Sequence, residues 1–183
     1  MTEPPSIDLE TNDVASRTET RIHGLLARPN GGESLVTVAA AESLTGGNVA
    51  ARITSISGSS SYFLGSIVAY GNEAKASLLG VSRETLETRG AVSAECAREM
   101  AEGARRAFGA DLAVATTGIA GPGGATERKV VGLVYVGLAG PQGVTCEEFH
   151  FPGGRAVVTD AATEAALLML LRGLERHLGA EYR

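Results

Sequence analysis

Three stretches of the sequence carry side chains that can do chemistry. Ser43 stands in "VAAAESLTGG", between a short apolar run and a glycine pair, and Tyr70 and Lys75 stand together in "VAYGNEAK". The third stretch, "TTGIAGPGGAT" at residues 116–126, combines threonine hydroxyls with glycines, which let backbone amides approach a ligand closely. A hydroxyl, an amine and open amides are the groups that acyl transfer uses.

Ser43 has two interpretations. A hydroxyl just ahead of a helix, followed by Gly46 and Gly47, can be an N-cap that accepts from the first free amides. Alternatively, the helix start and the open amides form a cradle for an oxyanion or a phosphate, beside a nucleophilic serine. The second interpretation requires a base.

The usual base, histidine, is poorly placed, because none of His23, His150 and His177 lies in a glycine-rich junction. A lysine can activate a serine if it loses its proton. Lowering the pKa of Lys75 from near 10.4 to about 7 requires roughly 4–5 kcal/mol, which a dry pocket poor in cations supplies. Alternatively, charged Lys75 lowers the pKa of Tyr70, which relays the proton. The non-catalytic alternative is an interfacial tyrosine beside a solvated lysine.

The glycine-rich stretch matches no common phosphate motif. "TTGIAGPGG" lacks the Gly-Lys-Ser/Thr of a P-loop and is not a dinucleotide G-x-G-x-x-G. Thr116 and Thr117 can orient a ligand or cap the loop. A plain long turn is the alternative.

The surrounding elements predict an α/β fold. Helices are predicted to begin near residues 13, 46, 72, 83, 94 and 155. Strands are predicted at residues 34–40, 63–70, 111–118, 130–140 and 144–151. The last two strands flank a "GPQG" turn, which predicts a hairpin. Together these elements indicate a single three-layer α/β/α domain with a mixed β-sheet.

Several ends of these elements have specific signals. Asp13, Asn72, Ser82 and Ser93 are predicted to cap helices, and Gly109 is predicted to end one. The three chemical stretches all follow the C-terminal ends of predicted strands, where ligands collect in open α/β sheets. We therefore expect them to share one pocket.

Composition narrows the classes of function. The 183 residues, 44% of them hydrophobic, fit one domain, and a net charge of −5 offers no broad basic surface for nucleic acid. Cys96 and Cys146 show neither metal-type spacing nor a disulfide framework. Residues 1–13 form an acidic segment expected to be disordered, and no apolar run approaches the roughly 20 residues of a membrane span. We expect a cytoplasmic protein with no membrane contact.

Taken in order, the motifs closely resemble a known family. "AESLTGG", "GSSSYFLGSIVAYGNEAK", "LGVS", "GAVS", "ATTGIAGPGG", "VGLVYVGLAG" and "FPGGR" are similar to the C-terminal domain of the competence/damage-inducible protein CinA, in its stand-alone form. The likeness runs from about residue 36 to residue 178. Ordered motifs over that length are far more specific than any single motif.

The resemblance implies an amidohydrolase that converts nicotinamide mononucleotide to nicotinate mononucleotide and ammonia, without a metal or cofactor. It implies that Ser43 is the nucleophile and that Tyr70 and Lys75 activate it. A homo-oligomer that binds this small nucleotide is expected. The substrate-binding residues implied are Glu42, Thr45, Gly46, Gly47, Thr116, Thr117, Gly118, Gly121, Gly123, Gly124 and Arg155, the last on the phosphate.

The sequence departs from the family pattern at two positions and leaves alternatives open. Leu44 stands where cysteine is common, and Gly71 where serine or threonine is common. One rival interpretation is a catalytically silent module that binds a pyridine nucleotide. The other is an interaction protein of DNA uptake or damage response, and the acidic net charge argues against direct contact of such a protein with DNA. Whether Lys75 or Tyr70 accepts the proton also stays open.

Overall fold

The computed structural model describes residues 17–27, 34–127 and 129–181. Within these ranges the chain alternates helices with five strands that form one sheet. The elements are α1 (Thr18–Leu26), β1 (Val38–Glu42), α2 (Asn48–Thr54), the 3₁₀ turn η2 (Ser59–Ser61), β2 (Phe63–Val68), α3 (Asn72–Leu79), α4 (Arg83–Thr88), α5 (Ala94–Phe108), β3 (Leu112–Gly118), β4 (Leu133–Gly140), β5 (Gly143–His150) and α6 (Arg155–Glu181).

The sheet has the strand order β2-β1-β3-β4-β5. β1 pairs in parallel with both β2 and β3, whereas β3–β4 and β4–β5 are antiparallel. The β4–β5 register runs from Leu133 opposite His150 to Gly140 opposite Gly143, so the two strands form the predicted hairpin. The sheet is therefore mixed, as the sequence predicted. Its three parallel strands all end at one edge.

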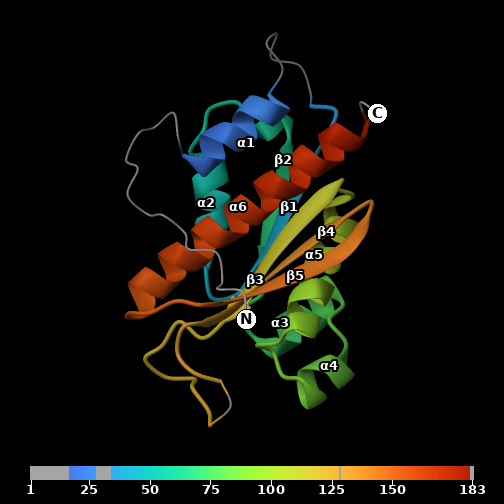
Figure 1. Ribbon diagram of the computed structural model, residues 1–183. Helices are drawn as coiled ribbons and strands as arrows, with labels where there is room; N and C mark the ends of the chain where they lie inside the picture. Colours follow the sequence, from blue (N-terminus) through green and yellow to red (C-terminus); the bar gives the residue numbers. More distant parts are fainter. Residues whose placement is uncertain (1–16, 28–33, 128, 182–183) are drawn as a thin grey trace.

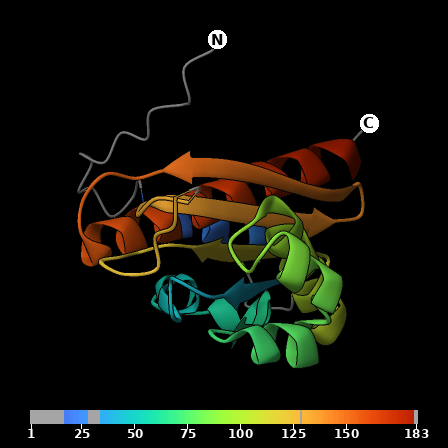
Figure 2. The ribbon, with the colours of Figure 1, turned by 90° about the horizontal axis from the view of Figure 1, so that it is seen from below.

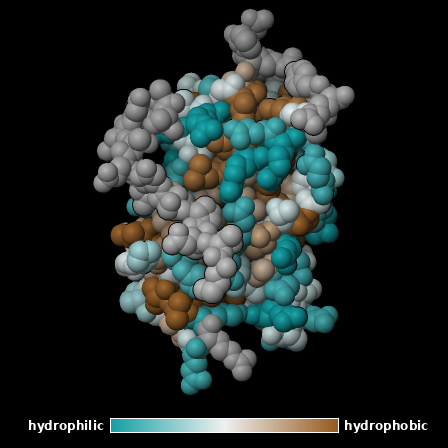
Figure 3. All heavy atoms as spheres, in the orientation of Figure 1, coloured by the Kyte–Doolittle hydropathy of each residue, from teal (hydrophilic) through white to brown (hydrophobic). Residues whose placement is uncertain are grey.

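Helices cover both faces of the sheet, which confirms the predicted three layers. The long α6 crosses one face diagonally, with α1 and α2 against it, and α5 lies behind the sheet with α3 and α4 beside it (Figures 1 and 2). We call these the α6 face and the α5 face. On the exterior above α6, hydrophilic and hydrophobic residues are interspersed (Figure 3).

The two faces have different cores. The α6 face is filled with large side chains such as Leu167, Leu170 and Leu174, all fully buried. The α5 face is lined largely by alanines of β1, β3 and α5. Small side chains allow close approach there, and a Cβ added at Gly103 of α5 would lie 2.0 Å from the carbonyl oxygen of Leu79 in α3. That contact places α3 directly against α5.

Most predicted element ends agree with the structure. The side chains of Ser82 and Ser93 cap α4 and α5, and Gly109 ends α5 in the left-handed conformation with φ of 65°. The predicted cap at Asn72 was one residue too far along, because Gly71 is the N-cap of α3. The first helix begins at Thr18, with Arg17 as its N-cap, and not near residue 13 as predicted. Asp13 and the expected acidic segment 1–13 lie outside the described residues.

The first strand begins later than predicted. Its ladder starts at Val38 and not at Ser34, because the amide and the hydroxyl of Thr37 both donate to the Asp111 carboxylate, at 2.7 and 2.8 Å. These bonds occupy the Thr37 amide, while its carbonyl accepts from the amides of Asp111 and Leu112, at 3.1 and 3.2 Å. None of the helices within the described ranges is long and apolar enough to cross a membrane.

Candidate active site

Ser43 lies in a buried turn between β1, which ends at Glu42, and α2, which begins at Asn48. Its side chain is near the surface, with 8% of the residue exposed, and its amide donates to the carbonyl of Thr116 in β3 at 3.0 Å. Gly46 and Gly47 have φ of 61° and 107°, which L side chains rarely adopt. The glycine pair therefore allows the chain to reverse from strand to helix behind the serine.

Lys75 reaches Ser43 directly. The residue is only 1% exposed, and its Nζ lies 2.9 Å from the Ser43 Oγ. The same nitrogen donates to the backbone carbonyls of Ala69 and Tyr70, at 2.8 and 3.1 Å. A neutral lysine has two protons and one lone pair. With both protons on the two carbonyls, the lone pair of the amine is left for the serine hydroxyl.

The surroundings of Lys75 favour this neutral form. Burial lowers the pKa of Lys75, and the nearby Cys96 thiol acts in the opposite direction to a smaller extent. Burial in turn raises the pKa of Cys96 to about 11, so the thiol carries no charge at neutral pH. The bonds of the Lys75 amine within the described structure go to a hydroxyl and two carbonyls, and none goes to a carboxylate.

Tyr70 stands at the rim of this site and its side chain faces elsewhere. The residue is 59% exposed, and its hydroxyl accepts a hydrogen bond from Nη2 of Arg155 at 2.7 Å. Nη1 of Arg155 donates to the carbonyl of Gly121 at 3.1 Å. The arginine thus joins the end of β2, the glycine-rich loop and the start of α6. Among the described contacts, the Tyr70 hydroxyl bonds neither Ser43 nor Lys75.

The glycine pair does not provide the amides that the sequence led us to expect. The amide of Gly47 donates to the Glu42 carboxylate at 2.8 Å, and that of Gly46 to the Ser43 carbonyl at 3.2 Å. Both are therefore occupied. The amides of Leu44 and Thr45 have no acceptor within the part of the chain that the structure describes, and these are the donors nearest in sequence to the serine.

Three of the hydroxyls implied as ligands are buried and hydrogen-bonded within the protein. The Oγ1 atoms of Thr45 and Thr116 lie 2.8 Å apart, and that of Thr117 donates to the carbonyl of Ala91 at 2.6 Å. Glu42 is also fully buried. Glu42, Thr45 and Thr116 support the Ser43 turn, and Thr117 bonds the segment before α5. None of the four side chains is open to a bound molecule in this structure.

The glycine-rich loop divides into two parts. A Cβ at Gly118 would lie 2.7 Å from the Leu133 carbonyl oxygen, so this residue serves close strand packing. Gly123 and Gly124 are exposed, and Gly121 holds Arg155 through its carbonyl. Residues 121–124 are therefore the part of the loop that lies at the rim.

Sequence reasoning missed Ser66 and Lys129. The Ser66 hydroxyl donates to Glu42, and its signal was a single polar residue inside the apolar run "FLGSIV". Lys129 donates to the carbonyls of Arg89 and Val92 at 2.7 and 2.6 Å, which ties the loop to the segment before α5. Nothing in the sequence near Lys129 indicates that contact.

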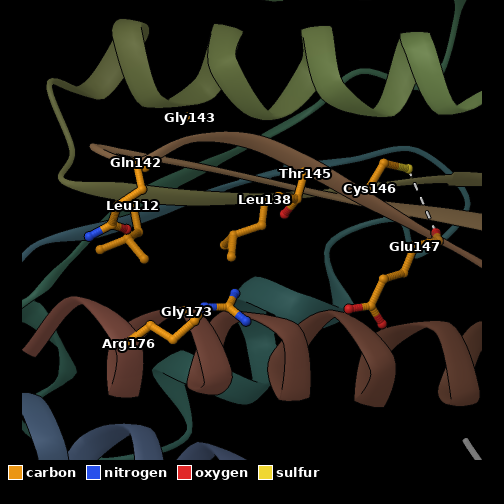
Figure 4. A pocket seen from close by; sticks show the side chains of 10 residues that line it. Leu112, Leu138, Gln142, Gly143, Thr145, Cys146, Glu147, Gly173 and Arg176 are labelled. Carbon is orange, nitrogen blue, oxygen red and sulfur yellow. Dashed lines mark hydrogen bonds between the residues drawn. The ribbon is translucent and has the colours of Figure 1, made fainter. Parts of the chain in front are cut away.

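A separate hollow of about 320 Å³ lies at the opposite end of the sheet. Leu112, Leu138 and Gly173 form part of its wall, and Arg176 of α6 and Glu147 of β5 extend beside it (Figure 4). Its residues come from the start of β3, the β4–β5 hairpin and the C-terminal half of α6, so it is remote in the fold from the Ser43 turn. No cluster of three or more metal-ligating His, Cys, Asp or Glu residues occurs among the residues described.

The fold and the site together define an α/β/α domain with a buried serine–lysine pair where its parallel strands end. Comparison with known proteins then places the chain in the CinA C-terminal domain family, whose profile matches residues 29–174. The chain belongs to this family, as its motifs led us to expect.

Individual relatives agree with this assignment. The chain is 52% identical over 138 residues to a CinA-like protein of Syntrophomonas wolfei, covering 75% of this chain and 33% of that protein. A CinA-like protein of Mycobacterium avium is 45% identical over 90% of this chain and 38% of its own length. The chain thus spans about a third of the length of these relatives.

A solved structure matches the whole fold. The competence/damage inducible protein CihA from Agrobacterium tumefaciens superposes with a TM-score of 0.80 at 39% identity, covering 92% of this chain and 99% of that one. A CinA superfamily protein from Klebsiella pneumoniae gives a TM-score of 0.79 at 30% identity, covering 87% and 96% of the two chains.

Proposed function

We propose that this protein is an amidohydrolase that converts nicotinamide mononucleotide to nicotinate mononucleotide and ammonia. The observation that carries the proposal is the 2.9 Å contact between Lys75 Nζ and Ser43 Oγ, with the lysine buried away from any carboxylate partner. A serine beside a lysine with a lowered pKa is a nucleophile with its base. The choice of substrate rests on the family resemblance.

In the proposed reaction, the Ser43 oxygen attacks the carboxamide carbon while neutral Lys75 takes the hydroxyl proton. The tetrahedral intermediate then collapses with cleavage of the C–N bond, and Lys75 returns the proton to the departing ammonia. Water hydrolyses the resulting acyl-enzyme, with Lys75 again accepting a proton. We assign the base to Lys75 and not to Tyr70, because only the lysine amine contacts the serine oxygen.

The oxyanion of the intermediate requires preorganised donors. Gly46 and Gly47 are excluded from this role by their existing hydrogen bonds. We assign it to the amides of Leu44 and Thr45, which are the donors left over in the Ser43 turn. The side chain of residue 44 is not needed for that, which fits a leucine at this position.

The rim holds the rest of the nucleotide. Arg155 lies beside Tyr70 and Gly121, near the exposed Gly123 and Gly124, and its guanidinium supplies the positive charge for the phosphate. The tyrosine ring contributes an exposed apolar surface. Anchoring the nucleotide here orients the carboxamide toward Ser43, which is an entropic contribution to the rate. A cytoplasmic location and self-association remain predictions.

The test is ammonia release from nicotinamide mononucleotide by the purified chain, with chelator present to suppress contaminating metalloenzymes. We expect turnover in the wild type and in Ser77→Ala, a serine-to-alanine control on exposed α3 surface, and none in Ser43→Ala. A folded wild type that is stabilised by the nucleotide yet releases no ammonia is instead a silent binding module, and the proposal is then wrong.

A further inference from the structure

Glu42 has an unusual set of partners for a residue with no exposed surface. Its carboxylate receives five hydrogen bonds, and all five partners are donors. Oε2 accepts from the Thr45 hydroxyl and the amides of Gly47 and Val49, at 2.8, 2.8 and 3.1 Å. Oε1 accepts from the Ala50 amide and the Ser66 hydroxyl, both at 3.0 Å. An ionised carboxylate, which only accepts, suits such a site.

These bonds connect the Ser43 turn to all three parallel strands. Glu42 is the last residue of β1, and Ser66 lies on β2. Thr45, which bonds Glu42, also bonds the Thr116 hydroxyl on β3. Ser43 lies between Glu42 and Thr45 in the sequence, so the carboxylate of the residue before the nucleophile holds the chain that follows it.

The hydrogen bonds to Glu42 also occupy backbone amides at the start of α2. Amides at a helix start attract anions, and here three of them already face a negative side chain. An anionic group of the substrate has no free amides at that position. The phosphate is thereby restricted to the rim around Arg155.

We propose that Glu42 is a positioning residue: its buried carboxylate holds the Ser43 turn for attack and excludes external anions from the start of α2. This replaces the substrate contact that the sequence led us to expect for Glu42, and it rests on the proposed function in taking Ser43 as the nucleophile. Glu42 itself contacts neither substrate nor the reacting atoms.

The test compares Glu42→Gln with a matched control, Asp111→Asn. Asp111 precedes β3 and accepts from Thr37 just ahead of β1, at the opposite end of the sheet, so both variants neutralise a carboxylate that is hydrogen-bonded at an end of these strands. Glutamine places an NH₂ group against amide donors and cannot satisfy all five partners. Ser66→Ala removes one donor and leaves the charge, which provides a milder variant if Glu42→Gln fails to fold.

Two rates are measured in the full chain at a temperature where each variant is folded. One is labelling of Ser43 by a fluorophosphonate, which does not depend on the choice of substrate, and the other is kcat for ammonia release. We expect both to fall about 10–100-fold in Glu42→Gln and several-fold in Ser66→Ala, with KM and the pH profile unchanged. In Asp111→Asn both rates are expected to stay within about twofold of the wild type, since catalysis is insensitive to distant changes that leave the site's geometry intact.

The outcomes separate the two proposals. Labelling without ammonia release in the wild type contradicts the proposed substrate, while the labelling ratio still tests Glu42. Unchanged rates in a folded Glu42→Gln, or a raised KM at unchanged kcat, overturn the positioning role in favour of a structural role or a substrate contact. A wild type that neither labels nor turns over overturns both.

Discussion

The two faces of the sheet are built differently, and the catalytic candidates come from both. The α6 face is packed with leucines and Met169 of α6, whereas the α5 face is lined by alanines and carries the buried amine of Lys75. Ser43 lies in the turn that leads to α2, on the α6 face, and Lys75 lies on α3, on the α5 face. The pair therefore forms only because both layers reach the same edge of the sheet.

This difference separates stability from function. Large buried side chains contribute most of the free energy of folding, at about 25 cal/mol per Å² of apolar surface. An alanine-lined face buries less apolar surface per residue, but its helices lie closer to the sheet. We infer that the α6 face mainly stabilises the domain, while the α5 face places a group that is costly to bury.

The largest expected effect is that of Lys75→Met. Loss of a general base costs about 10²–10⁴-fold in rate, so ammonia release should fall by that factor in kcat. The free energy of unfolding should not decrease, because methionine fills a similar volume and brings no charge into the interior. Steady-state kinetics measure the loss of kcat, and thermal unfolding measures the change in stability. A variant that loses stability in proportion to activity would contradict a functional role for the α5 face.

The opposite pattern is expected for Leu174→Ala on the α6 face. Leu174 is fully buried in the core of large side chains, and its truncation should destabilise the domain by about 2–5 kcal/mol. The value of kcat per folded molecule should stay within twofold or so of the wild type, because the residue is one position from Gly173 at the remote end of the sheet. Urea unfolding and kinetics at low temperature measure the two quantities.

The features that position Ser43 and Lys75 differ in how far the sequence alone could predict them. The strand-to-helix junction at Ser43, the hairpin and the caps at Ser82 and Ser93 were predictable, because each depends on a local pattern of apolar, glycine or hydroxyl residues. Burial of Lys75 was only a possibility, because it depends on how α3 packs on α5. That packing is set by Gly103, a residue without any local signal in the helical run.

The roles of the polar residues show the same limit. The family resemblance implied that Glu42, Thr45, Thr116 and Thr117 contact the ligand. The structure buries their side chains in hydrogen bonds to one another and to the backbone. Polar side chains at a strand end look alike in sequence whether they bind a ligand or support the turn beneath it.

Two matched glycine variants compare the faces directly. In Gly103→Ala the new Cβ meets the Leu79 carbonyl oxygen at 2.0 Å, a backbone atom that moves only if α3 moves, whereas in Gly173→Ala it meets the side chain of Leu138 at 2.6 Å. Leu79 is one helical turn after Lys75, so the first substitution also displaces the amine.

We expect Gly103→Ala to cost roughly 1–3 kcal/mol and to lower kcat about tenfold or more. Gly173→Ala should be close to neutral, because a better helix former offsets a shift of the leucine by about 0.5–1 kcal/mol. Unfolding curves and kinetics of both variants are the measurement. Equal loss of kcat in the two variants would remove the distinction between the faces.

The pH dependence sharpens the role assigned to the α5 face. Burial lowers the pKa of Lys75 below its usual 10.5, so kcat/KM should rise with pH, about tenfold per unit, until the amine is neutral.

The stability of the domain should also depend on pH. Between the lowered pKa and 10.5 the unfolded chain binds more protons than the folded chain, so the free energy of unfolding rises with pH. Lys75→Met should lack that contribution to the stability profile. An unaltered profile in this variant would show that the lysine is not buried as described.

The smallest expected effect is that of Gly71→Ser at the start of α3. Gly71 is the N-cap with φ of −89° and ψ of 158°, and no side chain caps the helix. A Cβ there meets nothing within 4 Å, so a serine fits without strain. The serine hydroxyl can accept from the first amides of the helix. Replacing glycine also reduces the conformational freedom of the unfolded chain, so the free energy of unfolding should rise by about 0.5–1 kcal/mol. Because α3 carries Lys75, a firmer start of this helix should raise kcat slightly or leave it unchanged.

Gly143→Ser is the control for the loss of a glycine. Its φ of 111° makes a side chain unfavourable, so this variant should lose stability without any change in kcat.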